Sequence, residues 1–74
     1  MNRIIEMFKE LGFKYSTFWT DAGDRDIFTH VDTGKQIIFY EEEGDDGHGY
    51  HIDNGLVIVK LHNAISAYIE YKGW

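Results

Sequence analysis

The residues best suited to chemistry or recognition lie in one acidic segment, residues 41–46, where five of six side chains are carboxylates. A dense negative patch attracts and orients basic partners and raises the rate of association. We therefore predict a partner-binding surface formed by Glu41, Glu42, Glu43, Asp45 and Asp46 together with the neighbouring Tyr40. The alternative interpretation is a solvated loop that keeps a small protein soluble and protects a sheet edge.

Metal binding is the second chemistry that this region suggests. His48 and His51 have an H-x-x-H spacing, and they follow Asp45 and Asp46 closely. Zinc accepts histidine together with carboxylate, but a strand that starts at residue 50 would leave His48 outside it. An EF-hand calcium loop does not fit either, because Gly44 stands where the third-position ligand belongs. We predict no metal and no other cofactor, and these four residues remain the alternative metal ligands.

The chain lacks the motifs of common catalytic sites. It contains no cysteine, and its two serines, Ser16 and Ser66, do not lie in a nucleophile elbow. The Gly34-Lys35 pair lacks the upstream glycine and the following helix of a phosphate-binding loop. We therefore predict a protein without enzymatic activity.

Negative charge is concentrated in the middle of this 74-residue chain. There are 13 acidic and 7 basic residues, which give a net charge of -6, and ten of the acids lie in residues 21–53. This balance argues against direct binding of nucleic acid, because phosphate contacts depend on Lys and Arg. No apolar run approaches the roughly 20 residues that cross a bilayer, so we expect a cytoplasmic protein without a signal peptide.

Hydrophobic periodicity predicts a single α+β domain over residues 1–74. Apolar residues recur at helical spacing in residues 2–11 and 61–72, and the second helix has an alternative start at Leu56. Strands are predicted over residues 13–20, 27–32, 36–42, 50–53 and 56–59, with Asn54-Gly55 as a hairpin turn before the last. The expected fold is a small antiparallel sheet of four to five strands with an N-terminal and a C-terminal helix, in the order α-β-β-β-β-β-α.

Aromatic residues make up 16% of the chain, which is more than so small a core needs. Phe18 and Trp19 are neighbours in a predicted strand, so their side chains point to opposite faces of the sheet. At least one of them is therefore expected at the surface or under a partner, since aromatic residues are enriched at interfaces. A homodimer would provide such an interface.

These features predict a small acidic interaction protein that binds a basic protein, with no direct contact to nucleic acid or membrane. The expected partner class is a nucleic-acid-binding protein, which the chain would inhibit or modulate, by analogy with small proteins of phages and mobile elements. Two alternatives stay open. One is a calcium- or zinc-binding module in the acidic and histidine-containing loop, and the other is a structural homo-oligomer whose acids serve only solubility.

Overall fold

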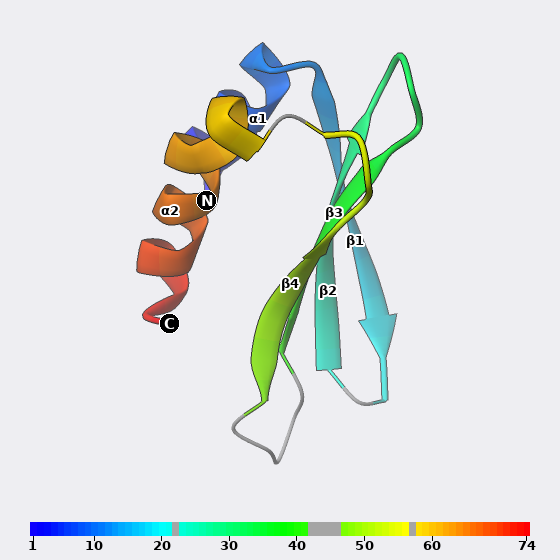
Figure 1. The fold of residues 1–74 in the computed structure, drawn as a ribbon. Helices are drawn as coiled ribbons and strands as arrows, with labels where there is room; N and C mark the ends of the chain where they lie inside the picture. Colours follow the sequence, from blue (N-terminus) through cyan, green and yellow to red (C-terminus); the bar gives the residue numbers. More distant parts are fainter. Residues whose placement is uncertain (22, 42–46, 57) are drawn as a thin grey trace.

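The protein folds as a four-stranded antiparallel sheet with one helix before it and one after it (Figure 1). The computed structural model describes residues 1–21, 23–41, 47–56 and 58–74. In chain order the elements are α1 (Asn2–Glu10), β1 (Phe13–Thr20), β2 (Gly23–His30), β3 (Gln36–Glu41), β4 (His48–Ile52) and α2 (Ile58–Lys72). This arrangement confirms the predicted α+β fold. Within the part of the chain that the structure describes, no helix combines the length and apolar character that a bilayer crossing requires.

The predicted fifth strand, residues 56–59, is wrong, because α2 begins at Ile58. Asn54 and Gly55 do form a turn, and Gly55 has a φ of +93°. That turn connects β4 to α2 instead of joining two strands. The β-branched residues of this stretch favour a strand locally, but the apolar stripe that begins at Leu61 packs as a helix. Tertiary packing therefore overrides local propensity here.

The core lies between the helices and one face of the sheet, because side chains alternate between the two faces of each strand. From the sheet it contains Phe13, Phe28, Ile37 and Phe39, all of which are at most 5% exposed. From the helices it contains Ile4, Phe8, Leu61, Ala64, Ile65 and Tyr68. Two stacked ring pairs join the layers: Phe8 lies 4.0 Å from Phe28, and Tyr68 lies 3.8 Å from Phe39, between ring centroids.

The end of α2 has the backbone pattern of a Schellman motif. The amide of Trp74 donates to the carbonyl of Ile69 at 3.0 Å, and Gly73 has a φ of +73°. A glycine suits this left-handed position because it has no Cβ. The aromatic residue that follows, Trp74, then packs against the core.

In the part of the chain that the structure describes, no helix covers the opposite face of the sheet, which we call the open face (Figure 1). Strand register brings Ile27 next to Ile38 and Arg25 next to Tyr40 on it, and Phe18 lies opposite Arg25. The Arg25 guanidinium lies 5.5 Å from the centre of the Tyr40 ring. Phe18 is 58% exposed, so this face presents apolar and aromatic side chains to solvent.

Because the core lies on one face of the sheet, removing a phenylalanine ring from that face should destabilise the fold more than removing one from the open face. Phe28→Ala empties a fully buried position and should lower the free energy of unfolding by about 3–5 kcal/mol. Phe18→Ala removes the same ring from the open face and should cost less than about 1 kcal/mol. Urea denaturation measures both values.

If Phe28→Ala does not fold, Ile37→Val is the milder probe, with an expected loss of about 0.5–1.5 kcal/mol. Similar losses at Phe18 and Phe28 would contradict the one-sided core.

Candidate functional site

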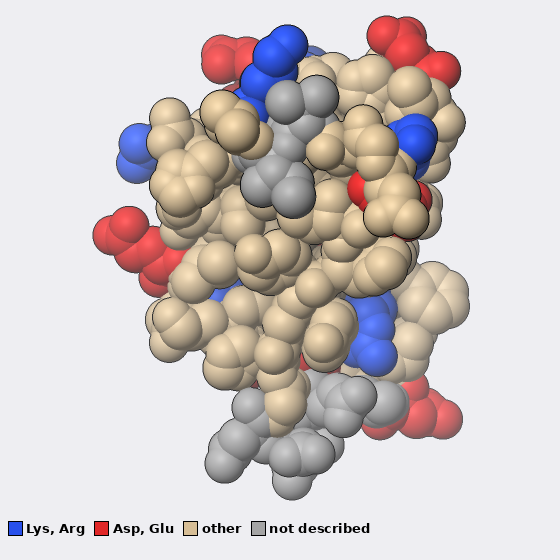
Figure 2. Space-filling view, viewed as in Figure 1, with Lys and Arg blue, Asp and Glu red and all other residues tan. Residues whose placement is uncertain are grey.

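Acidic side chains gather at the end of the sheet where β1 meets β2 and where β3 ends. Asp21, Asp24, Asp26 and Glu41 lie here, and we call these four residues the acidic end. In an antiparallel sheet whose strands pair in sequence order, the first and third strands end at the same end of the sheet. Red side chains are visible at the lower margin of Figure 2, where β1 ends and β2 begins in Figure 1.

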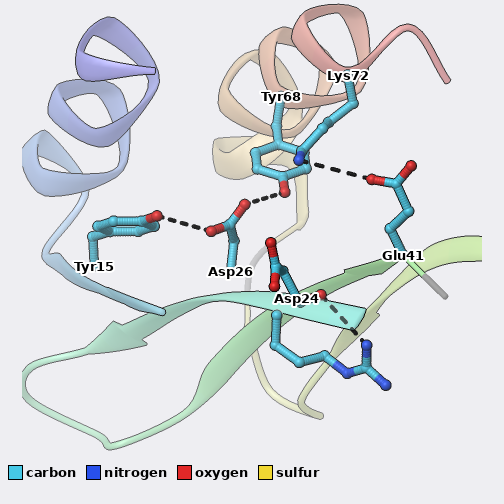
Figure 3. A network of polar contacts seen from close by, with 7 residues as sticks. Tyr15, Asp24, Asp26, Glu41, Tyr68 and Lys72 are labelled. Carbon is cyan, nitrogen blue, oxygen red and sulfur yellow. Dashed lines mark hydrogen bonds and ion pairs between the residues drawn. The ribbon is translucent and has the colours of Figure 1, made fainter. Parts of the chain in front are cut away.

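The Asp26 carboxylate is held between two tyrosine hydroxyls (Figure 3). Tyr15 donates to Oδ1 at 2.8 Å, and Tyr68 donates to Oδ2. Asp26 lies on the helix-covered face, two residues before the buried Phe28, so β2 alternation turns its side chain toward α2. Tyr68 therefore has two roles: its ring belongs to the core and its hydroxyl anchors the acidic end.

This arrangement disfavours loss of the tyrosine protons. Burial is the largest cause, followed by the hydrogen bond to Asp26 and the nearby negative charge of its carboxylate. Together they raise the pKa of Tyr15 from 10.0 to about 12. The same causes raise the pKa of the more deeply placed Tyr68 further. Both hydroxyls thus remain donors at neutral pH.

The end of α2 is attached to the sheet beside this network. Lys72 Nζ lies 3.9 Å from Glu41 Oε2 and 5.9 Å from the centre of the Tyr68 ring. The His48 ring, which follows the β3–β4 connection, stacks on Trp74 with 4.6 Å between centroids. These partly exposed contacts contribute little energy individually, but they place one cation next to Glu41.

A hollow of about 270 Å³ opens beside Asp26 on the helix-covered side of the sheet. Aromatic and charged side chains line it, among them Tyr15, Trp19, Asp24, Asp26, Tyr71 and Lys72. Trp19 is 81% exposed and is paired directly with Asp24 across the strands. An exposed ring next to a carboxylate can receive a cationic side chain, because both attract positive charge.

Of the six predicted partner-binding residues, the structure describes Tyr40 and Glu41, and their side chains lie on opposite faces of the sheet. Glu41 ends β3 on the helix-covered face, whereas Tyr40 lies on the open face across Gly49 and next to Arg25. The other four predicted residues, Glu42, Glu43, Asp45 and Asp46, lie outside the described residues. Phe18 and Trp19 are both exposed, one on each face of the sheet. The expectation that at least one of them lies at the surface is therefore confirmed.

The alternative metal ligands are also separated where the structure describes them. His48 and His51 are three positions apart in β4 and so point to opposite faces of the sheet. His48 contacts Trp74, while His51 Nε2 lies 3.3 Å from Asp53 Oδ1. Asp45 and Asp46 lie outside the described residues. Among the described residues, no three His, Cys, Asp or Glu side chains converge as metal ligands would.

The sequence-based prediction missed Trp19, Asp24 and Asp26 as members of a site. A period of two in residues 24–28 was the available signal, since Asp24, Asp26 and Phe28 share one face of any strand that contains them. The predicted strand began only at residue 27, which hid this pattern. The pairing of Trp19 with Asp24 further required the register of β1 and β2.

The Tyr15–Asp26–Tyr68 network predicts a specific response to Asp26→Asn, which removes the charge and keeps the shape. The pKa of Tyr15 should fall from about 12 toward 10 without reaching it, because burial still disfavours the phenolate. A raised phenol pKa stabilises the fold below pH 10 or so, and that contribution is lost as the pH rises through 12 or so. Asp26→Asn should therefore flatten the alkaline part of the stability curve.

NMR titration of isotope-labelled tyrosine measures the pKa, and urea denaturation between neutral and alkaline pH measures the stability. Asp24→Asn is the matched control, because Asp24 accepts a hydrogen bond from neither Tyr15 nor Tyr68. A Tyr15 titration that is the same in wild type and Asp26→Asn would refute the role of the carboxylate.

Comparison of the chain with models of protein families, with curated proteins and with solved structures finds no match. Function is therefore inferred from the side chains of the acidic end and from the surfaces around it.

Proposed function

We propose that this protein binds a basic segment of another protein through its acidic end and acts as a non-catalytic interaction protein. The observation that carries the proposal is the pairing of Trp19 with Asp24 at the rim of the acidic end. A tryptophan that is 81% exposed contributes nothing to the core. Exposed tryptophans are instead enriched among the residues that dominate binding energies at interfaces.

The chemistry of the hollow favours an arginine or lysine side chain as the group that enters it. The cation would lie over the Trp19 ring, with the Asp24 carboxylate as its hydrogen-bond acceptor. Asp26 already accepts from Tyr15 and Tyr68. It would therefore act through its charge and keep the wall of the hollow in place.

Lys72 is the internal competitor for such a cation. It lines the same hollow and lies 3.9 Å from Glu41, a separation typical of a weak, solvent-screened ion pair. A basic partner can therefore displace it at small cost. Glu42, Glu43, Asp45 and Asp46 follow Glu41 directly in sequence, so they add negative charge next to this end and would increase the rate of association.

The class of partner follows from this charge. Surfaces that bind phosphate carry clustered Lys and Arg, so a nucleic-acid-binding protein offers the complement of the acidic end. Occupying such a surface would block access of the nucleic acid. We therefore propose inhibition or modulation of a nucleic-acid-binding protein as the biological outcome.

A fluorescently labelled oligoarginine peptide tests the proposed site by anisotropy. Trp19→Ala and Asp24→Asn should each weaken binding by about two- to fivefold, the range expected for a cation–π contact or an exposed ion pair. Phe18→Ala and Asp32→Asn are the matched controls, because they remove an exposed ring and an exposed carboxylate away from the hollow. Equal effects of test and control variants would overturn the proposal.

Net charge is controlled separately with two triple variants that each remove three acids. One changes Glu41, Glu42 and Glu43 to Gln, and the other changes the exposed helix residues Glu6, Glu10 and Glu70 to Gln. Binding should weaken with added salt in the wild type and should fall more in the first triple variant. Equal loss of peptide affinity in both triple variants would show that binding depends on net charge alone.

Self-association is a second candidate function, and the open face favours it. An apolar surface that neither α1 nor α2 covers is formed by Phe18, Ile27, Ile38 and Tyr40. A second copy would supply an equivalent apolar surface in an isologous dimer. Light scattering should then detect a dimer in the wild type that Phe18→Ser disrupts. Trp19→Ser, an exposed ring on the other face, is the control, and a wild type that stays monomeric at all concentrations excludes this candidate.

A further inference from the structure

A second hollow lies at the other end of the sheet, between the β2–β3 turn and the start of α2. Its volume is about 260 Å³. Core and near-core side chains form its apolar wall, namely Leu11, Phe13, Leu56 and Leu61. Pockets for drug-sized ligands span roughly 300–1,000 Å³, so this one suits a smaller molecule with an apolar body.

Among the described residues, the ionisable groups that line this hollow are all basic. They are His30, Lys35 and Lys60, and no Asp or Glu that the structure describes lines it. This is the reverse of the chain as a whole, in which acids outnumber bases 13 to 7. The polar rim of the hollow therefore complements an anion.

The start of α2 adds to this preference. A helix N-terminus carries partial positive charge, which acidic residues usually balance. The first turn of α2 contains no acidic residue and instead contains Lys60. This placement costs helix stability in the free protein, and an anion bound near Lys60 would offset that cost.

Two of the basic groups are held in position by neighbouring polar atoms. The Lys35 ammonium donates to the carbonyl of Asn54, which ties the β2–β3 turn to the segment before α2. His30 Nδ1 lies 3.3 Å from the Thr33 hydroxyl, and the His30 and Phe13 rings form a T-shaped pair with 5.1 Å between centroids. Lys60 is exposed and remains able to reorient toward a ligand.

We propose that this hollow binds a small organic carboxylate with an apolar body. The carboxylate would lie between Lys35 and Lys60 near the start of α2, and the apolar body would pack on Leu11, Leu56 and Leu61. The site is separate from the acidic end, because the two hollows share none of the lining residues that the structure describes.

Octanoate is the probe, and NMR amide shifts of the intact protein are the readout. Octanoate should shift the amides of His30, Lys35, Leu56 and Lys60 in a saturable manner. Three control compounds separate the contributions: octanol lacks the charge, octylammonium reverses it, and inorganic phosphate lacks the apolar body. Each should bind more weakly than octanoate. Equal or tighter binding of octanol or octylammonium would overturn the proposal, as would the absence of saturable shifts at these residues.

Lys60→Gln provides the matched test of charge. It should weaken octanoate binding roughly three- to fivefold, as expected for one partly exposed ion pair, and leave the protein folded. Lys9→Gln removes an exposed lysine that does not line the hollow, and it should leave the affinity unchanged. Equal losses in the two variants would show a net-charge effect and refute the site.

Binding of the oligoarginine peptide should be preserved in Lys60→Gln. Failure of octanoate binding therefore leaves the proposal for the acidic end intact, and failure of peptide binding leaves this one intact.

Discussion

Two stacked aromatic contacts hold this molecule together, Phe8 on Phe28 and Tyr68 on Phe39. Each joins one helix to the same face of the sheet, so a 74-residue chain without disulfides concentrates its apolar burial in a single layer. A chain of this size buries only about 60% of its extended surface, and both helices that the structure describes lie on the same face of the sheet. The open face and its exposed Phe18 follow from this constraint.

Tyr68 links the core to the acidic end, because its ring packs on Phe39 while its hydroxyl donates to Asp26. The position of a half-buried carboxylate is thus set by the same packing that stabilises the fold. Hydrogen bonding to two tyrosines compensates the loss of water around Asp26. The neighbouring Asp24 and Trp19 are exposed beside this hydrogen-bonded carboxylate.

Charge is separated along the sheet. One hollow is bordered by Asp24, Asp26 and Trp19, and the other by His30, Lys35 and Lys60. The two hollows lie at opposite ends of the strands, since successive connections of an antiparallel sheet alternate between its two ends. The net charge of the whole chain, -6, therefore does not give the charge of the residues that line either hollow.

The class of fold, both helices and the approximate positions of four strands were predictable from the sequence, because apolar periodicity and glycine placement are local signals. The sequence also located the excess of negative charge between residues 21 and 53. The start of α2 at Ile58, in place of a strand over residues 56–59, depends on tertiary contacts, since packing of the apolar stripe that begins at Leu61 outweighs β-branched propensity there. The same holds for contacts between residues distant in sequence. Docking of α2 on the sheet brings Tyr68 to Asp26, 42 positions away, and the register of β1 and β2 pairs Trp19 with Asp24.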